Sequence, residues 1–345
     1  FRRARAGGMI GEPWFWRERT LAARAASLSL APAAFIYDGA QLLRAAMTRP
    51  APAPVPVFCV GNATLGGVGK TPFAIMLAQR LKALGHEPYF LTRGYGGALR
   101  GPVPVDPDRH SADDVGDEAL LLAAEAPTWV AHDRPAGANA ATAAGARSIV
   151  MDDGFQNPTL RKTFSFLLVD ARDPFGNARI FPAGPLREPI GRAASRADAL
   201  VTVVAEATDE AGGADGLPDA PRRLRAWLEV DAPPAPQRVH AFCGVGRPQR
   251  FFDLLARHGF DVAAARAFPD HHTFTDAEMT RLRRDAAKED AALITTAKDF
   301  IRLPQDQRKG VRVLPVSMRT DDPAALDAMA SAAIASFAGS GRSSA

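Results

Sequence analysis

Short apolar runs alternate with stretches of helical periodicity through much of the chain. Six of these runs are expected to be strands, at residues 55–60, 88–92, 128–131, 148–151, 164–169 and 199–204. Between them, apolar residues recur every three or four positions at 72–84, 117–126 and 135–144, which predicts helices. Strands separated by helices of this length form βαβ units. The pattern therefore predicts an α/β fold whose parallel sheet is covered on both faces.

A second alternation of the same kind follows residue 238. Strands are expected at 239–243, 261–265, 291–295 and 311–316, and helices at 249–258 and 276–289. Residues 207–236, between the two alternations, are rich in Gly, Pro, Ala and Asp and contain one strand-like run at 224–230. The sequence thus predicts four parts, which are an N-terminal segment (1–50), a core (51–215), a linker (216–237) and a smaller C-terminal α/β lobe (238–338).

The N-terminal segment has the pattern of an amphipathic helix over residues 14–47. Its apolar stripe consists of Phe35, Ile36, Ala40, Leu42, Leu43, Ala46 and Met47, with Asp38, Gln41 and Arg44 on the other side. Trp14, Phe15 and Trp16 directly precede Arg17 and Arg19, an arrangement that suits a membrane interface. The same pattern is typical of a helix packed on a globular domain, and the sequence leaves both interpretations open.

Composition and charge narrow the class of protein. The chain has 345 residues, 47% hydrophobic, which is enough for two globular domains with their own cores. The formal net charge is +4, but the first 50 residues alone carry +5 and the other 295 sum to −1. A nucleic-acid-binding protein usually spreads its basic side chains over a folded face, so we expect no nucleic-acid partner. The sequence begins with Phe1. If translation starts at Met9, the formal net charge of the part up to residue 50 falls from +5 to +2.

The two cysteines, Cys59 and Cys243, lie far apart in apolar runs. This usage predicts buried, reduced thiols in a cytosolic protein and neither a disulfide framework nor a metal cluster. No secretory signal is evident. The longest uncharged apolar stretch near the start is 13 residues, 25–37, shorter than the roughly 18 to 20 that a membrane-spanning helix needs.

The clearest chemical motif is the sequence GNATLGGVGKTP at residues 61–72, between a predicted strand and a predicted helix. In a phosphate-binding loop, glycines let backbone N–H groups turn toward phosphate oxygens, a lysine reaches the β- and γ-phosphates, and a hydroxyl binds Mg²⁺. The strict pattern has Gly at position 64, where this chain has Thr64, but Gly66 and Gly67 supply the flexibility. The predicted ATP-binding residues are Thr64, Leu65, Gly66, Gly67, Val68, Gly69, Lys70 and Thr71.

Acidic residues follow in two places. Asp152 and Asp153 end an apolar strand downstream of the loop, where the carboxylate that organises Mg²⁺ is expected because adjacent strand ends meet at one edge of the sheet. The alternative is an ordinary Asp-Gly turn. Asp117 and Glu118 open a predicted helix, where carboxylates often only cap the helix or complement its dipole.

A histidine motif, Phe268-Pro269-Asp270-His271-His272, lies in the predicted C-terminal lobe. A histidine beside a carboxylate can orient or tune a catalytic base. An exposed pair of histidines is more often inert.

Taken in order, these motifs resemble those of the tetraacyldisaccharide 4'-kinase family of lipid A biosynthesis in Gram-negative bacteria. The resemblance covers about residues 12 to 330. It rests on Thr64–Thr71, Arg93-Gly94-Tyr95-Gly96, Gly116-Asp117-Glu118, Asp152-Asp153-Gly154-Phe155-Gln156, Pro182-Ala183-Gly184-Pro185-Leu186-Arg187-Glu188, Phe268-Pro269-Asp270-His271-His272 and Thr295-Thr296-Ala297-Lys298-Asp299.

The resemblance implies ATP-dependent phosphorylation of the 4'-hydroxyl of a tetraacylated glucosamine disaccharide 1-phosphate at the cytosolic face of the inner membrane. It implies a P-loop α/β core, an N-terminal membrane-associating helix and a smaller C-terminal lobe, with ATP and Mg²⁺ as cofactors. The partners implied are the lipid disaccharide and the membrane surface, with no obligate protein partner.

The resemblance also assigns roles to single residues. Lys70 would hold the phosphates, and Thr71, Asp152, Asp153 and Glu118 would organise Mg²⁺. Asp117 resembles the base that takes the sugar hydroxyl proton, paired with His271 or, as the alternative left open, His272. Arg93, Tyr95 and Arg187 are weaker candidates for contacts to substrate or phosphate.

Two other functions stay open on the sequence. One is a P-loop kinase of a soluble small molecule, which would need no amphipathic N-terminus. The other is an ATP-driven switch protein or metallochaperone. Such proteins commonly place a second lysine just before the paired glycines, where this chain has Leu65, and a cluster of Cys or His for metal delivery is absent from the sequence.

Overall fold

The computed structural model describes residues 12–209, 217–231 and 237–342, and the chain folds into two compact units. Of the described residues, the large unit comprises those within 15–229 and 317–342, and the small unit comprises those within 12–14 and 230–316. Met9 and the three arginines at positions 2, 3 and 5, which enter the charge argument, lie outside the described residues.

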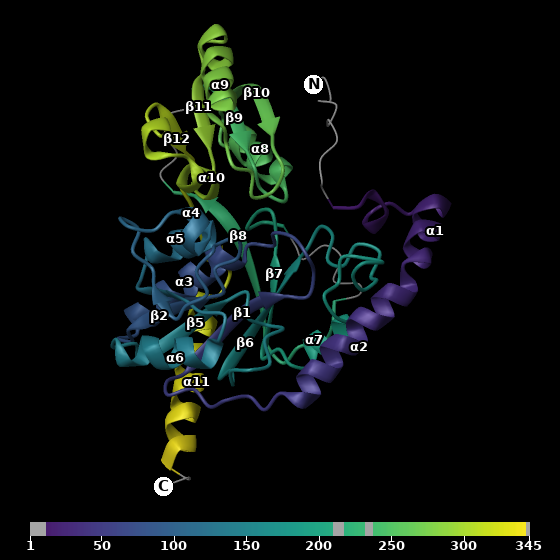
Figure 1. Ribbon diagram of the computed structural model, residues 1–345, viewed down its shortest axis with the longest axis vertical. Coiled ribbons are helices and arrows are strands. Elements are labelled where there is room, and N and C mark those ends of the chain that lie inside the picture. Colours follow the sequence, from purple (N-terminus) through teal and green to yellow (C-terminus); the bar gives the residue numbers. More distant parts are fainter. Residues whose placement is uncertain (1–11, 210–216, 232–236, 343–345) are drawn as a thin grey trace. The chain divides into compact units, whose positions relative to one another are not determined.

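A mixed, mostly parallel sheet forms the centre of the large unit (Figure 1). Its nine described strands are, in spatial order, β13 (Val316–Thr320), β8 (Arg223–Val230), β7 (Ala199–Val203), β6 (Phe164–Asp170), β1 (Val57–Asn62), β5 (Ser148–Asp152), β2 (Pro88–Thr92), β4 (Thr128–Val130) and β3 (Val103–Pro104). The strands from β8 to β4 are parallel, and β3 runs antiparallel to β4. The predicted α/β fold with a parallel core is confirmed.

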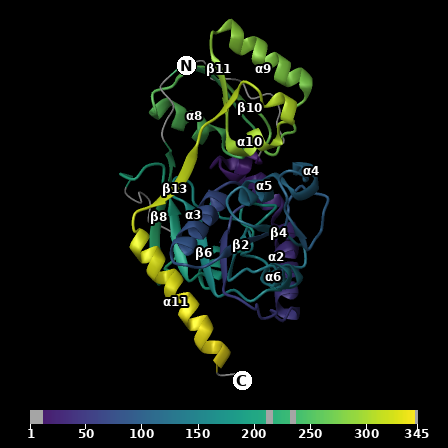
Figure 2. The same ribbon diagram turned by 90° about the vertical axis from the view of Figure 1, so that its left-hand side faces the viewer.

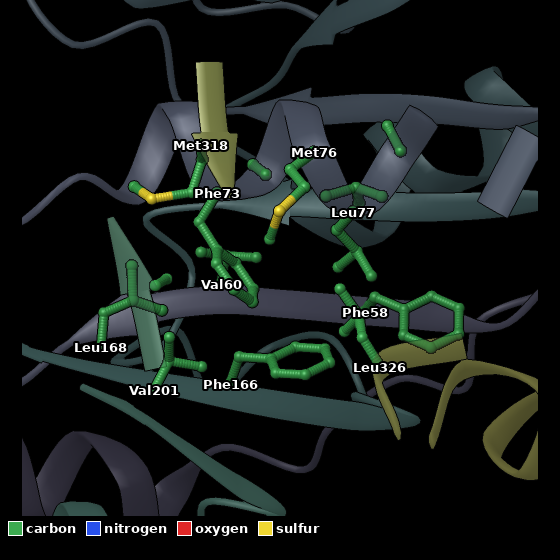
Figure 3. Packing of buried hydrophobic residues seen from close by; sticks show 14 of the residues in the cluster. Phe58, Val60, Phe73, Met76, Leu77, Phe166, Leu168, Val201, Met318 and Leu326 are labelled. Carbon is green, nitrogen blue, oxygen red and sulfur yellow. The ribbon is translucent and has the colours of Figure 1, made fainter. Parts of the chain in front are cut away.

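Helices bury both faces of this sheet, which explains why its strands are apolar at successive positions. In β1, Phe58 and Val60 belong to one core cluster, and Val57 and Cys59 belong to another. The helices are α3 (Lys70–Ala83), α4 (Ala112–Val115), α5 (Asp117–Ala123), α6 (Arg134–Ala143) and α7 (Ile190–Ala194). Figure 3 shows side chains of α3, including Phe73, facing those of β1 and β6 in the first cluster.

The C-terminal residues belong to the large unit, which differs from the predicted boundaries of the lobe. The run predicted as one strand at 311–316 is two, β12 (Val311–Val313) and β13, and β13 joins the large sheet. Helix α11 (Pro323–Arg342) follows and buries Leu326 in the first core cluster (Figures 2 and 3). Strand β8 likewise pairs with β7, although its residues fall in the predicted linker.

Two consecutive helices, α1 (Leu21–Ser29) and α2 (Ala31–Met47), replace the single predicted N-terminal helix, after the short 3₁₀ turn η1 (Trp14–Trp16). The apolar stripe of α2 faces away from the protein, since Phe35 is 81% and Met47 77% exposed, while Asp38 on the other side is half-buried. This is the reverse of a helix packed on a core through its apolar face. No helix in the described ranges combines the length and hydropathy needed to cross a bilayer.

The small unit contains a second, parallel sheet in the order β10 (Asp261–Ala267), β9 (Arg238–Cys243), β11 (Ala292–Thr295) and β12. It is packed by α8 (Pro248–Arg257), α9 (Asp276–Lys288) and α10 (Ala297–Arg302), followed by the 3₁₀ turn η2 (Gln305–Gln307). The predicted elements of this unit lie within a few residues of those observed. The smaller α/β lobe is thus present with its own core.

Candidate functional site

The glycine-rich loop lies between β1 and α3, in the strand, loop and helix order that phosphate-binding loops require. Gly69 is the N-cap of α3 with a left-handed backbone (φ 96°), and Lys70 is the first residue of the helix. Asn62, at the end of β1, donates a hydrogen bond from Nδ2 to Thr64 Oγ1 at 3.2 Å. The N-terminus of α3, which is 14 residues long, favours a bound phosphate because its first backbone N–H groups and the helix dipole attract an anion.

Two carboxylates at the end of β5 meet the start of α3. Thr71 Oγ1 donates to Asp152 Oδ2 at 2.8 Å, and Lys70 Nζ lies 3.7 Å from Asp153 Oδ1. Arg187 donates to both oxygens of Asp153, from Nη1 at 2.8 Å and from Nη2 at 3.1 Å. The structure therefore joins Lys70, Thr71, both aspartates and Arg187 in one cluster.

The two aspartates have opposite electrostatic environments. Burial raises the pKa of Asp152 to about 7, and the nearby Glu118 and Asp153 carboxylates act in the same direction. Burial would also raise the pKa of Asp153, but the Lys70 and Arg187 cations outweigh it and hold this pKa at about 2. Asp153 is thus an anion at neutral pH, whereas Asp152 is only partly ionised there, and a nearby cation would favour its ionised form.

The donor set fits Mg²⁺ of the kind that P-loop proteins bind. Asp152 Oδ1 is buried without a hydrogen-bond partner, and its other oxygen already meets the Thr71 hydroxyl. In the described part of the chain, no three Asp, Glu, His or Cys side chains converge into an all-protein metal cage. Mg²⁺ in phosphoryl-transfer sites keeps several waters and binds through one or two protein ligands plus phosphate oxygens, so no such cage is required.

Asp117 and Glu118 begin α5, next to the Arg93–Gly97 loop. Asp117 is buried, and its Oδ1 accepts a hydrogen bond from the Glu118 backbone N–H at 2.8 Å. Gly116 precedes them with φ 86°, and a Cβ there would lie 2.5 Å from the Tyr95 carbonyl oxygen. The close approach of these two loops explains why glycine stands before Asp117, and the electrostatic effect of Glu118 on Asp152 places that carboxylate near the β5 cluster.

The weaker substrate candidates are exposed on this side of the unit. Tyr95 is 67% exposed and Arg93 is exposed as well. Arg93 lies close enough to the buried Arg134 to lower the pKa of that guanidinium. The roles of Arg93 and Tyr95 in binding substrate or phosphate stay predictions.

Three further residues around the cluster were not singled out in the sequence. Arg134 is buried at the start of α6, and burial, aided by Arg93, lowers its pKa to about 10. Gln156 Nε2 donates to Asn62 O at 2.9 Å and to Glu188 Oε1 at 3.1 Å. Gln156 and Glu188 belong to quoted motifs and were within reach of sequence reasoning, whereas Arg134 precedes a proline and looks only like a helix start.

The histidine motif lies in the small unit. His271 has a left-handed backbone (φ 58°) and a ring flanked by two cations, with Lys298 Nζ 3.2 Å from Nε2 and Arg302 Nη2 3.2 Å from Nδ1. Asp270 Oδ1 lies 3.9 Å from His271 Nε2. Lys298 comes from the Thr295–Asp299 motif, so two distant motifs of the sequence meet at this imidazole.

His272 contacts residues that pack or cap helix α9. Its Nε2 lies 3.0 Å from Glu278 Oε2, the carboxylate that completes the capping box of α9 with Thr275. Its ring stacks on Phe268 at 4.8 Å and meets Phe274 edge-on at 5.0 Å. These contacts hold His272 in the packing of α9, whereas the ring of His271 contacts the polar groups of Lys298 and Arg302.

Comparison with known proteins gives one consistent result. The family model of tetraacyldisaccharide-1-P 4'-kinase matches residues 26–335. The chain is 48% identical to the tetraacyldisaccharide 4'-kinase of Rhodospirillum centenum over 91% of its length and 94% of the relative's. It is 49% identical to that of Paramagnetospirillum magneticum, over 91% and 96%. The crystal structure of LpxK from Aquifex aeolicus in complex with ATP, described as an "apo" form, superposes with a TM-score of 0.72 at 26% identity, covering 89% of this chain and 99% of that one.

Proposed function

The chain belongs to the tetraacyldisaccharide-1-P 4'-kinase family, and from this premise we propose how its residues divide the work of phosphoryl transfer. It is an ATP-dependent kinase of the lipid A pathway that phosphorylates the 4'-hydroxyl of tetraacyldisaccharide 1-phosphate. Phosphoryl transfer needs mainly positioning and neutralisation of charge, so the task of each residue can be argued from the charges around it.

The proposal rests mainly on the contacts between the end of the glycine-rich loop and the two carboxylates at the end of β5. Lys70 pairs loosely with Asp153 at 3.7 Å, a distance at which its ammonium can turn toward the β- and γ-phosphates. Arg187 remains on Asp153 through two hydrogen bonds and keeps this carboxylate in place when Lys70 leaves it. Thr71 and Asp152 would hold Mg²⁺, with Glu118 nearby, and the metal would neutralise charge on the phosphates.

Asp117 is the proposed base for the 4'-hydroxyl proton. Its backbone position is fixed by Gly116, and its Oδ1 is oriented by the Glu118 N–H. His271 is its proposed partner in catalysis, because His272 is occupied by Glu278 and two phenylalanine rings. The two residues belong to different units of the chain, and their pairing is a proposal for the working enzyme.

We further propose that α1 and α2 attach the enzyme to the inner surface of the membrane in which the acylated substrate resides. The support is the outward-facing apolar row on both helices, which comprises Leu21, Leu28, Phe35, Ile36, Leu42, Leu43 and Met47. Arg24 and Arg44 on the same helices are cations that anionic lipid headgroups would attract. A lipid surface accounts for an apolar face that would otherwise be held in water.

A transfer assay with γ-³²P-labelled ATP tests the activity. With tetraacyldisaccharide 1-phosphate in mixed micelles, we expect labelled lipid from the wild-type chain and none from Lys70→Ala, because the γ-phosphate is no longer positioned. Lys82→Ala, at the exposed end of the same helix, is the matched control and should retain activity. If the wild-type chain produced no labelled lipid, the proposed function would be refuted. The same holds if it transferred the labelled phosphate only to a deacylated, soluble disaccharide.

A further inference from the structure

The segment 173–188, here called the brace, contacts the N-terminal helices through Asn177. The side-chain Nδ2 of Asn177 lies within hydrogen-bond distance of Phe15 O (3.3 Å), Ser27 Oγ (3.2 Å) and Ala183 O (2.9 Å), and its backbone N–H donates to Trp16 O at 2.8 Å. Ser27, buried on α1, donates from Oγ to Ala183 O at 2.6 Å. One amide therefore joins η1, α1 and the brace.

Aromatic and charged contacts extend this joint. Trp16 is buried and donates from Nε1 to Pro182 O at 3.1 Å. Phe181 lies between the rings of Trp16 and Tyr37 in edge-on contacts, with centroids 6.2 and 5.4 Å away. Arg17 forms an ion pair with Asp173 at the start of the brace. The brace thus holds both α1 and α2 by packing as well as by hydrogen bonds.

The other end of the brace is joined to the phosphate-binding loop. Leu65 N–H donates to Pro185 O at 2.7 Å, and Arg187 N–H donates to Ala63 O at 2.7 Å, so Thr64 and Leu186 form a short antiparallel bridge. The Arg187 side chain continues to Asp153. The path from the exposed apolar helices to the γ-phosphate site consists of direct contacts at every step.

Little freedom remains inside the brace or in α2. A Cβ on Gly184 would lie 2.1 Å from the Asn177 side-chain Oδ1 and 2.3 Å from the Arg179 carbonyl oxygen, so only glycine fits at this position of the brace. Helix α2 is also held at its middle by an ion pair between Asp38 and Arg192 of α7, and just after its end by Ala51, whose N–H donates to Thr159 O at 2.8 Å (Figure 1). Contacts therefore hold α2 at Tyr37 and Asp38 and hold the chain after it at Ala51, as a fixed platform requires.

We propose that the brace sets the position of the membrane-facing helices relative to the γ-phosphate site, with Asn177 as its central positioning residue. This inference rests on the proposed function, because it concerns a substrate that stays in a lipid surface while its sugar hydroxyl reaches the nucleotide. An enzyme attached to a membrane must place its reacting phosphate at the depth of that hydroxyl. Misplacement of about 1 Å can cost on the order of 100-fold in rate.

The test variant is Asn177→Asp, which keeps the shape of the side chain but removes the Nδ2 donor. Asn139→Asp, on an exposed position of α6, makes the same chemical change away from the brace and is the matched control. Ser27→Ala is a milder second variant of the same joint, in case the charge of Asn177→Asp prevents folding. Each is compared with the wild-type chain by thermal unfolding before kinetics.

Two measurements follow. The first is kcat/KM for tetraacyldisaccharide 1-phosphate in anionic vesicles, beside the Kd for ATP and vesicle cosedimentation. The second is the distance distribution between nitroxide labels at Arg44→Cys on α2 and Lys82→Cys on α3, both exposed, whereas the native cysteines are buried. We expect the brace variants to lose roughly 10- to 100-fold in kcat/KM with unchanged ATP binding and cosedimentation, and to broaden the distance distribution.

Each outcome is decisive. Unchanged kinetics and an unchanged distance distribution in both brace variants would overturn the proposal. So would a loss of lipid turnover accompanied by an equal loss of ATP affinity, because the effect would then act through the nucleotide site. If the wild-type chain labels no lipid, the proposed function fails, and the distance distributions still decide whether the brace is rigid.

Discussion

At the scale of single residues, a few side chains derive their chemistry from their neighbours. Asp152 and Asp153 are adjacent in sequence, yet their pKa values are about 7 and about 2. Burial raises the pKa of both carboxyls, but the Lys70 and Arg187 cations lower that of Asp153, whereas the Glu118 and Asp153 carboxylates raise that of Asp152 further. A sequence shows the two carboxylates but not which cation each one meets.

Removal of the proposed base should separate chemistry from nucleotide binding. Asp117→Ala is expected to lower kcat by roughly 10²- to 10⁴-fold, because general base catalysis contributes about that much, while the Kd for ATP stays unchanged. Asp113→Ala, an exposed carboxylate on the preceding helix, is the control and should retain activity. A variant with full turnover, or one whose only defect is in ATP affinity, would remove Asp117 from the role of base.

Because its pKa is raised, Asp152 should lower the free energy of unfolding of the metal-free protein as pH rises. Its pKa is raised from 3.8 to about 7 on folding, so between these values the folded state keeps a proton that the unfolded state releases. The free energy of unfolding therefore falls from about pH 4 to about pH 7 and levels off above that. Asp152→Asn, which can still accept the Thr71 hydrogen bond, should lack this fall.

Thermal melts between pH 5 and 8 in the presence of EDTA measure the effect. The melting temperature of Asp152→Asn minus that of the wild type should increase with pH. A constant difference across this range would show that Asp152 is already ionised at pH 5.

At the scale of elements, α2 shows how the same periodicity can serve opposite environments. The stripe of Phe35, Ile36, Leu43 and Met47 was predicted correctly as a stripe, but two interpretations were open. The structure turns the stripe outward and Asp38 inward, where it meets Arg192. Helical periodicity shows which residues share one face of a helix. Whether that face lies against the protein or turns away from it depends on the tertiary structure.

Replacement of two exposed residues of this face should weaken membrane attachment. Phe35→Ser with Ile36→Ser removes side chains that are 81% and 71% exposed, so folding stability should hardly change. Each buried apolar side chain is worth about 1.5 to 3 kcal/mol, so the vesicle partition coefficient should fall by at least about 100-fold. Leu84→Ser, an exposed apolar residue at the end of α3, should leave partitioning unchanged. Equal cosedimentation of both variants would contradict the membrane proposal.

At the scale of the whole molecule, the chain leaves the large unit after Glu229 and returns to it at Ser317. Helix α11 then packs on α3 through Leu326, and Asp327 forms an ion pair with Arg80 (Figure 2). The last residues therefore stabilise the helix that begins at the phosphate-binding loop, although about 250 positions separate them in sequence.

This connection predicts which unit a C-terminal mutation affects. Leu326→Ala should destabilise the large unit by roughly 2 to 5 kcal/mol, the usual cost of such a cavity in a core. In hydrogen–deuterium exchange, β1 and α3 should exchange faster while β9 and β11 stay unchanged. Leu255→Ala, in the core of the small unit, should give the reverse pattern. Faster exchange of β9 and β11 in Leu326→Ala would place α11 with the small unit.

The sequence by itself determined what local patterns encode. It determined most strands and helices of both alternations, because side-chain periodicity follows backbone geometry, but not the division of residues 311–316 between β12 and β13. It also determined the glycine-rich loop, because its chemistry requires particular residues at fixed spacing within one stretch of chain. The order of the motifs was sufficient to place the chain in its family. Lys70 and Thr71 are therefore candidates that the sequence alone predicts.

Only the tertiary structure decided what depends on contacts between distant segments. It joined Arg187 to Asp153, brought Asn177 into contact with α1, and divided Leu314 from Met318 between two core clusters. It also showed Arg134 to be buried beside the carboxylates, which no pattern around that residue indicates. Burial and hydrogen bonding across long sequence separations set these features, and a one-dimensional pattern contains neither.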